Sequence, residues 1–249
     1  MKTPAITLHA RREDGFAERL AHTLALLQQT AERHSGRTVF TTSLGAEDMV
    51  LTDLIARHGL PIALATLQTG QLHAETLALL ARVEVHYGLA IEKWAPPAEQ
   101  VLNFMARNGE LPMRRSIELR RACCALRKLE PLSRALAGRT AWVTGLRREQ
   151  SDARAELPFT STDENGREKL NPLAAWSQAD VWHYIEAQGV PYNELHDRFY
   201  PSIGCAPCTR AVTPGEDIRA GRWWWEQESA KECGLHVNLL AEIAPKETA

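Results

Sequence analysis

Short apolar segments alternate with helical patterns along this chain of 249 residues, and this alternation restricts its fold more than any other feature. Residues 37–44, 61–67 and 89–94 are rich in residues that favour strands, and helical patterns follow the first two, one ending near Arg57 and one over 72–87. Strands that alternate with helices pair in parallel through right-handed crossovers. We therefore expect an α/β fold with a doubly wound, mostly parallel sheet.

Further segments extend this pattern. We predict helices over residues 15–34, 98–108, 114–136 and 177–188, and a strand over 140–144. The last helix has Ser177 as its N-cap and Asp180 three residues later, where a negative charge suits the helix dipole. Residues 212–249 are expected to form a separately mobile tail.

Polar turns follow three of the predicted strands, at residues 42–48, 68–73 and 144–154. Ligands of open parallel sheets bind beyond the carboxyl ends of the strands, so we expect these turns to face one crevice. Gly45 lies between a strand and a helix and would let backbone N–H groups approach an anion. The turn matches neither of the common phosphate-binding motifs and is a weak signal by itself.

Several arginines gather near these turns and near two of the cysteines, among them Arg154, Arg219 and Arg222. Their forked guanidinium groups suit phosphate and sulfate oxygens. The formal net charge of −2 provides no general attraction to nucleic acid or to anionic membranes. An anionic ligand must therefore be held by local basic clusters.

Four of the five cysteines form two tight pairs, Cys123 with Cys124 in a helical context and Cys205 with Cys208 in a turn-rich loop. Four thiolates suit an iron–sulfur cluster or a structural zinc ion. Adjacent cysteines strain the tetrahedral site of a single zinc ion, whereas a cubane offers a different iron to each sulfur, which favours the cluster. Inert buried thiols are the remaining interpretation.

Cys233 stands apart from these pairs. Lys231 and His236 lie near it in the sequence and would favour the thiolate, which is the nucleophilic form of cysteine. A surface thiol in a flexible end fits this segment equally well, so the segment alone leaves both interpretations open.

Two other groups of residues, histidines and a run of tryptophans, are interpreted as structural. Four histidines outside the tail show no HxxxH or HExxH spacing and are interpreted as ordinary: His73, His86, His183 and His196. The run Trp223–Trp224–Trp225 is interpreted as packing that docks the tail, with a partner-facing or nucleotide-covering surface as the alternative.

Together these motifs resemble the thioredoxin-dependent adenylyl-sulfate (APS) reductases of the APS/PAPS reductase family, PAPS being the 3′-phosphorylated form of APS. The resemblance spans residues 37–240, and its combination of motifs is highly specific although no single motif is. Beside the cysteine pairs it includes Thr69–Gly70, Glu75–Thr76, Lys128–Leu129–Glu130–Pro131, Thr144–Gly145, Asn171–Pro172–Leu173, Pro191–Tyr192–Asn193, Gly221–Arg222–Trp223–Trp224–Trp225 and Glu232–Cys233–Gly234–Leu235–His236.

The resemblance implies an adenine nucleotide α-hydrolase-like fold related to the PP-loop ATP pyrophosphatases. Residues 1–211 would form the nucleotide-binding domain that carries the cluster, and residues 212–249 the C-terminal segment that carries the catalytic cysteine. One 4Fe–4S cluster per chain would be bound by Cys123, Cys124, Cys205 and Cys208, with Cys233 as the nucleophile. Substrate contacts would map onto Ser43, Gly45, Lys128, Gly145, Arg154, Arg219, Arg222 and His236.

The implied activity is the reduction of APS to sulfite and AMP in sulfate assimilation, toward cysteine biosynthesis. The Cys233 thiolate would attack the sulfur of the sulfate group, and thioredoxin or a similar dithiol protein would release sulfite from the S-sulfocysteine. Two turns depart from the family. Leu67–Gln68–Thr69–Gly70–Gln71 stands where relatives usually read Leu-Asp-Thr-Gly-Arg or Leu-Asp-Thr-Gly-Tyr, and Thr42–Ser43–Leu44–Gly45 lacks the aromatic residue or extra serine that is common before that glycine.

Three alternatives remain beside this interpretation. The first is a reductase of PAPS, or of both nucleotides. The second, a zinc-stabilised ATP pyrophosphatase or adenylating enzyme, is disfavoured because residues 42–48 lack a Ser-Gly-Gly-x-Asp-Ser loop. The third is a non-catalytic iron–sulfur sensor or adapter module that docks through the tryptophan run.

No apolar run is long enough to cross a bilayer, and residues 1–12 lack the apolar stretch of a secretory signal. We therefore expect a cytoplasmic protein with no membrane or nucleic-acid partner. The sequence leaves the oligomeric state open, a homo-oligomer included.

Overall fold

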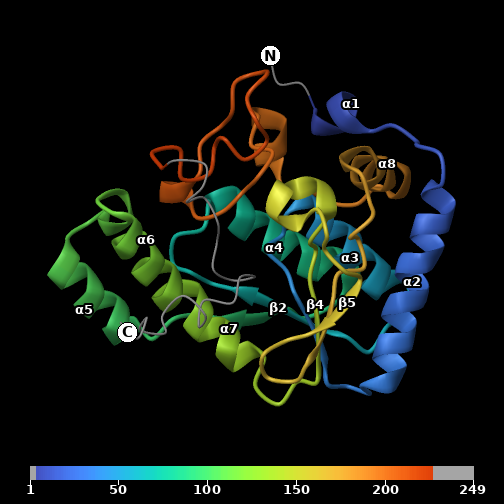
Figure 1. Cartoon of the computed structure of the whole chain (residues 1–249), viewed down its shortest axis with the longest axis horizontal. Coiled ribbons are helices and arrows are strands. Elements are labelled where there is room, and N and C mark those ends of the chain that lie inside the picture. The colour runs from blue at the N-terminus through green and yellow to red at the C-terminus, as the bar shows by residue number, and fades with distance from the viewer. Residues whose placement is uncertain (1–3, 227–249) are drawn as a thin grey trace, which may run out of the picture.

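The computed structural model describes residues 4–226, in which helices and strands alternate as expected (Figure 1). The helices are α1 (Ala5–His9), α2 (Phe16–Arg33), α3 (Ala46–Arg57), α4 (Ala74–Tyr87), α5 (Ala98–Asn108), α6 (Ile117–Cys124), α7 (Glu130–Ala135) and α8 (Gln178–Gln188). The strands are β1 (Thr38–Thr41), β2 (Ala63–Leu67), β3 (Glu92–Trp94), β4 (Ala141–Val143), β5 (Thr160–Thr162) and β6 (Glu168–Leu170). The predicted α/β class is confirmed.

The strands form one sheet in the order β3-β2-β1-β4-β6-β5. All neighbours pair in parallel except β5, which runs antiparallel to β6 at one edge. The strand order changes direction at β1, which pairs with β2 on one side and with β4 on the other. Such a switch point is where open parallel sheets bind their ligands.

Successive side chains of the central strands point to opposite faces of the sheet, and helices cover both faces, so these strands are buried on both sides. Val39 of β1 and Trp142 of β4 pack with Leu132 of α7 on one face. Phe40 of β1 and Val143 of β4 belong to the larger core on the other face, where α3 packs against α8. In Figure 1, α5 and α6 lie at one side of the strands and α2 at the other.

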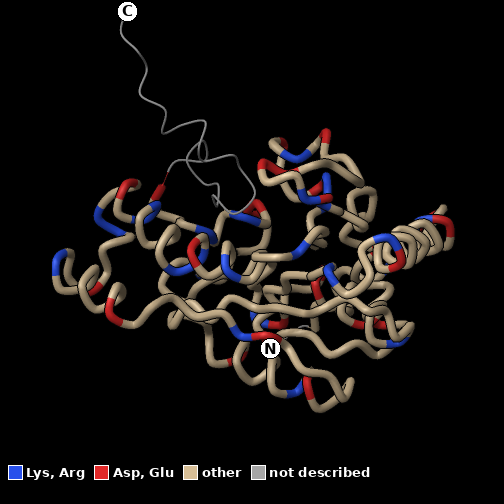
Figure 2. The backbone as a smooth tube through the Cα atoms, turned by 90° about the horizontal axis from the view of Figure 1, so that it is seen from below, with Lys and Arg blue, Asp and Glu red and all other residues tan. Residues whose placement is uncertain are grey.

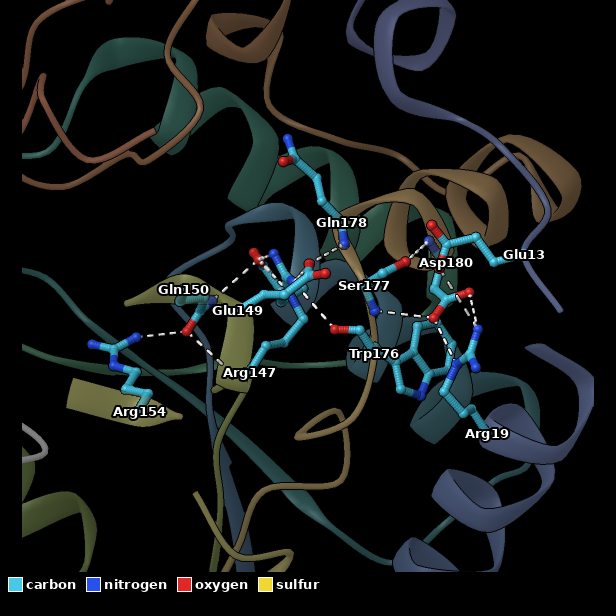
Figure 3. A network of polar contacts seen from close by, with 11 residues as sticks. Glu13, Arg19, Arg147, Glu149, Gln150, Arg154, Trp176, Ser177, Gln178 and Asp180 are labelled. Atoms are coloured by element: carbon cyan, nitrogen blue, oxygen red, sulfur yellow. Dashed lines mark hydrogen bonds and ion pairs between the residues drawn. The ribbon is translucent and has the colours of Figure 1, made fainter. Parts of the chain in front are cut away.

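The predicted N-cap of α8 is confirmed. The Ser177 hydroxyl accepts a hydrogen bond from the Asp180 backbone N–H, and the Asp180 carboxylate accepts one from the Ser177 N–H, both at 3.0 Å. Asp180 also binds the guanidinium of Arg19 through two hydrogen bonds, of 2.7 and 2.8 Å, which ties α8 to α2. Figure 3 shows these contacts at close range.

The helical stretch predicted over residues 114–136 is confirmed over residues 117–135, although one turn of it is not α-helical. A 3₁₀ turn over Pro112–Arg114 precedes α6, and a π-helical turn over Ala125–Leu129 separates α6 from α7. Pro131 lies in the first turn of α7 and has no N–H to continue an α-helical ladder from the preceding residues. Single π turns inside helices are frequent at functional sites, and this one follows directly after Cys123 and Cys124.

Two elements were not predicted. The hairpin of β5 and β6 is short and polar, and its signal is the Asn165–Gly166 pair in the turn, where Gly166 has a φ of 76°. Helix α1 has five residues, and its first N–H donates to the Asp197 carboxylate at 2.8 Å, a contact that only the tertiary structure provides.

Within residues 4–226, no helix has both the length and the apolar character needed to span a bilayer. Basic and acidic residues are interspersed along the described backbone rather than segregated (Figure 2). The described chain therefore presents no large field of one sign, in agreement with its near-neutral net charge.

We expect Asp53→Ala to lower the free energy of unfolding by about 3 kcal/mol, because three donors lose a fully buried acceptor. Asp53 accepts hydrogen bonds from the Tyr87 and Tyr184 hydroxyls and from Arg57 Nε, all at 2.7 Å. Urea unfolding measures the change. Glu130→Ala removes a solvent-accessible ion pair with Arg134 and serves as the control with little effect. An equal loss in both variants would contradict the assignment.

Candidate functional site

A cavity lies at the carboxyl ends of β1, β2 and β4. It is lined by residues of all three predicted turns, including Ser43 and Gly45 after β1, Thr69 after β2, and Gly145 and Arg154 after β4. The predicted convergence of these turns on one crevice is therefore confirmed. The cavity continues to the segment after α8, which contributes Pro201, Ser202, Gly204, Cys205, Arg219 and Arg222.

The turn between β1 and α3 is held by the carboxylate of Asp48. This group accepts hydrogen bonds from the Ser43 N–H at 2.6 Å and from the Ser43 hydroxyl at 2.7 Å. Leu44 has a φ of 62°, a conformation that costs energy for a residue with a Cβ. Any side chain on Gly145 would collide with the Asp48 carboxylate, so this position requires glycine. The turn is thus held in a strained, defined shape at the N-terminus of α3.

Burial raises the pKa of Asp48 to about 6, although the hydrogen bonds from Ser43 favour the ionised form. Glu47 beside it behaves differently. Burial is the largest single effect and would raise its pKa, but the Arg147 charge and the hydrogen bonds from the backbone, Gln150 and Arg147 together outweigh it, and the net direction is downward. Two neighbouring carboxyl groups at one helix N-terminus therefore have opposite pKa shifts.

A polar network positions Arg154 at the rim of the cavity (Figure 3). Arg154 donates to Gln150 Oε1 at 2.5 Å, and Gln150 Nε2 donates to Glu47 Oε1 at 3.1 Å. Arg147 is buried and donates to the same Glu47 oxygen at 3.0 Å, to Glu149 at 2.9 Å and to the Trp176 carbonyl at 3.2 Å. Arg147 is thus committed to structural partners, whereas Arg154 reaches the cavity.

Cationic side chains also line the cavity, and one of them, Lys128, lines the cysteine pocket as well. Lys128 comes from the π-helical turn, and Arg219 and Arg222 come from the end of the described chain. A Cβ on Gly204 would lie 2.5 Å from the Arg222 guanidinium, so glycine is needed for this side chain to pass. Three cations in one concave region offset the charge of an anionic ligand despite the near-neutral chain.

The four paired cysteines line one pocket next to this cavity. Cys123 and Cys124 come from the end of α6, and Cys205 and Cys208 from the loop with the 3₁₀ turn Ala206–Cys208. Lys128 and Cys205 line both the pocket and the cavity. Within residues 4–226, no three His, Cys, Asp or Glu side chains converge on a point that one metal ion could occupy.

The turn after β2, which departs from the family pattern, supports the cysteine loop. The Ala206 N–H donates to the Gln71 carbonyl at 2.7 Å, and the Thr69 hydroxyl lies 3.4 Å from Cys205 Sγ. The Thr69 carbonyl accepts from Arg127 Nη1 at 2.7 Å. Backbone groups and Thr69 carry these contacts, so the replaced side chains at 68 and 71 do not disturb them.

Burial raises the pKa of Cys123 and raises that of Cys208 to about 11. Thiols of this kind remain protonated at neutral pH unless a metal centre binds their sulfur. The pocket also contains donors without acceptors. Trp223 Nε1 and Arg127 Nε are buried and have no hydrogen-bond partner in the described part of the chain. Four thiols with unused donors around them fit a group that carries sulfur acceptors, as an iron–sulfur cluster does.

The end of the described chain is docked against α6. Arg120 Nε forms a buried ion pair with Glu226 Oε1 at 2.7 Å, and its guanidinium carbon lies 4.7 Å from the centre of the Trp223 ring. Arg114 stacks similarly on Trp224, at 5.0 Å. The tryptophan run thus packs residues 222–226 beside the cysteine pocket, as the predicted docking role requires.

Most of the predicted site residues come together in space. The cavity is lined by Ser43, Gly45, Lys128, Gly145, Arg154, Arg219 and Arg222, and the adjoining pocket by Cys123, Cys124, Cys205 and Cys208. Cys233 and His236 lie outside the described residues. His196, which we interpreted from sequence as ordinary, also lines the cavity, and no spacing in the sequence indicated this.

A cavity with cationic side chains at the switch point of a parallel sheet, with four cysteines beside it, is the arrangement of a nucleotide-binding α/β protein. The sequence profile of the phosphoadenosine phosphosulfate reductase domain matches residues 37–211. The adenosine 5′-phosphosulfate reductase of Allochromatium vinosum is 55% identical over 235 residues, which are 94% of this chain and 90% of that protein. That of Burkholderia cepacia is 54% identical over 88% of each chain.

Solved structures agree with this assignment. The phosphoadenylyl-sulfate reductase of Candida auris, in its phosphate complex, is 28% identical with a TM-score of 0.64, over 76% of this chain and 90% of that one. The FMN adenylyltransferase of Candida glabrata shares the fold alone, at 17% identity and a TM-score of 0.55 over 92% and 80% of the chains. The chain belongs to the phosphoadenosine phosphosulfate reductase domain family, which confirms the resemblance found in the sequence.

We expect Asp48→Asn to remove a pH-dependent loss of stability. The pKa of Asp48 is about 6 in the folded chain and lower in the unfolded chain. Below the pKa of the unfolded chain the carboxyl group is protonated in both states and does not affect stability. As the pH rises from there through the pKa of the folded chain, ionisation of Asp48 progressively destabilises the folded state. Relative to the wild type, the variant should gain about 1 kcal/mol of unfolding free energy between about pH 5 and pH 7.5. Denaturant unfolding at both pH values measures it, and a constant difference would contradict the shift.

Proposed function

We propose that this protein is an adenosine 5′-phosphosulfate (APS) reductase that forms sulfite and AMP. The observation that carries the proposal is the shared border of the nucleotide cavity and the cysteine pocket at Lys128 and Cys205. Curated relatives above 50% identity that bear this activity in their names support it. APS carries a phosphate and a sulfate group, and the cationic side chains that line the cavity suit these anions.

In the first step the Cys233 thiolate attacks the sulfur of the sulfate group. The new S–S bond forms as the S–O bond to the phosphate breaks, and AMP leaves as a stable anion. Lys128, Arg219 and Arg222 offset the negative charge that accumulates between the attacking sulfur and the leaving phosphate. Glu226, the last described residue, is anchored on α6, and an extended chain of seven residues keeps Cys233 within about 25 Å of it.

In the second step a dithiol protein such as thioredoxin attacks the Cys233 sulfur. The S–S bond breaks, sulfite leaves, and a mixed disulfide forms, which the second thiol of the donor resolves to restore Cys233. The donor loses two electrons and the sulfur of the sulfate group gains them, so both steps balance without another oxidant or reductant.

Cys123, Cys124, Cys205 and Cys208 would hold the 4Fe–4S cluster. When bound, the cluster would supply a fixed local charge beside the cavity rather than electrons for the reaction. The buried donors of Arg127 and Trp223 would stabilise its sulfur atoms.

The nucleophile is tested by incubating anaerobically purified enzyme with APS in the absence of thiol. We expect the intact mass to increase by one sulfonate group on the wild type and not on Cys233→Ser, because only the thiolate can accept sulfur. Cys124→Ser tests a predicted cluster ligand in parallel and should lose iron. An unmodified wild type that binds iron and nucleotide would overturn the proposed chemistry and favour the iron–sulfur sensor or adapter.

The role of Lys128 is tested by single-turnover kinetics. Lys128→Ala should lower the rate of adduct formation by about 100-fold while AMP affinity changes far less, because charge builds up at the sulfate during attack. Lys93→Ala is the matched control, because this ammonium group is paired with Glu84 and does not line the cavity. A parallel loss of affinity and rate would instead assign Lys128 to ground-state binding.

A further inference from the structure

Helix α5 has an apolar face that the described chain does not bury. Val101, Leu102 and Met105 lie on one side of this helix, at the spacing that places residues on the same helical face. Leu102 is 69% exposed, and the other two are only half-buried. Each of the other seven α-helices within residues 4–226 buries at least one residue, whereas α5 buries none. A helix with one apolar face normally packs that face against another surface.

The adjoining side of α5 belongs to the cysteine pocket. Phe104 packs against the buried group that contains Met113, Trp223 and three of the paired cysteines. The helix also packs on the π-helical turn Ala125–Leu129, which contributes Lys128 to the cavity. In Figure 1, α5 lies at the edge of the molecule. Its apolar face is therefore open to a binding partner and adjoins the site.

The described chain ends close to α5. Glu226 is held on α6 by its buried ion pair with Arg120, and Trp225 packs against the same buried group as Phe104 of α5. Residues 227–249 therefore continue from this corner. Ten extended residues span roughly 35 Å, whereas a helix of eleven residues is about 16 Å long. The chain beyond Glu226 is thus long enough to reach any part of α5.

The sequence after Cys233 provides apolar residues that suit this face. Residues 227–232 contain no large aliphatic side chain. The large aliphatic residues that follow within ten positions of Cys233 are Leu235, Val237, Leu239, Leu240 and Ile243. Burial of one such side chain favours association by roughly tenfold to a hundredfold, so a few of them are sufficient for docking.

We propose that residues 235–243 dock on the apolar face of α5 in the same chain and thereby hold Cys233 next to the cavity. A second copy of the chain and the dithiol donor are the alternative occupants. The chain's own segment is favoured because it continues from a point beside the face, and a short linker keeps it there at an effective concentration of about millimolar.

The docked segment restricts Cys233 from both sides. Glu226 is anchored on α6 before it, and residues 235–243 are anchored on α5 after it. A thiolate held at both ends explores a smaller volume than one on a chain anchored at one end, so it meets the sulfate group more often. The role assigned to Cys233 rests on the proposed function, whereas the docking itself does not.

Proteolysis of the full-length, anaerobically purified holoenzyme tests the docking. Thermolysin cleaves before large apolar residues, and intact mass locates the cut. We expect Leu102→Asp to be cleaved within residues 235–243 about tenfold faster than the wild type, because a charge on the apolar face releases the segment. Val85→Asp is the matched control, since Val85 on α4 is 85% exposed, and it should not change the cleavage rate. Equal cleavage of wild type and Leu102→Asp would overturn the proposal.

Adduct formation with APS in the absence of thiol tests the role of the docking. Leu102→Asp should slow this step about tenfold without changing the affinity for AMP, because the cavity is intact and only the position of Cys233 is lost. Leu239→Asp should have the same effect, and the double variant should be no slower than either single variant, since both remove one contact. Thermal unfolding checks that each variant folds. Additive losses would contradict a shared contact.

The alternative occupants give different results in the same assays. A Leu102→Asp variant that forms the adduct normally but reacts slowly with the dithiol donor would assign the face to the donor and overturn the proposal. A rate of adduct formation that rises with enzyme concentration would assign the face to a second copy, with the same consequence. Protection from thermolysin in a wild type that forms no adduct would support the docking and overturn the proposed function.

Discussion

Parallel pairing of β1 with β2 on one side and β4 on the other is the constraint on which the site depends. Each of these strands is only three to five residues long, yet each ends at the same edge of the sheet. The turns that follow must therefore meet there, whatever their side chains. The buried two-sided core holds this edge in place, with α7 on one face and α3 and α8 on the other.

The site concentrates charge locally in a chain whose net charge is close to zero. The carboxylates at the N-terminus of α3 accept hydrogen bonds from within the chain, Asp48 from Ser43 and Glu47 from Arg147 and Gln150. The lysine and arginines that line the same cavity are the groups that attract an anion. The carboxylates thus fix the shape of the turn, and the cations that line the cavity provide the attraction for an anionic ligand.

The π-helical turn links the two halves of the site. It follows Cys123 and Cys124 and contributes Arg127 to the cysteine pocket and Lys128 to both the pocket and the cavity. A continuous α-helix would rotate these side chains differently relative to the cysteines. Pro131 makes that alternative unfavourable by removing a donor from the ladder. A single proline therefore influences how closely the cation and the cysteine ligands approach each other.

The sequence by itself determined the alternation of strands and helices, the two cysteine pairs, the lone Cys233 and the family, because these features are carried by local periodicity and by motifs. It also indicated the three turns that line the cavity, since parallel strands end at one edge. The domain boundary at 211, the cluster and the roles of Cys233 and His236 stay predictions. Only the tertiary structure decided that Arg154 reaches the cavity while Arg147 is buried among carboxylates, and that His196 belongs to the cavity wall. These outcomes depend on contacts between residues far apart in the chain, such as Glu47 with Arg147 and Trp182 with His196, and no local pattern encodes such contacts.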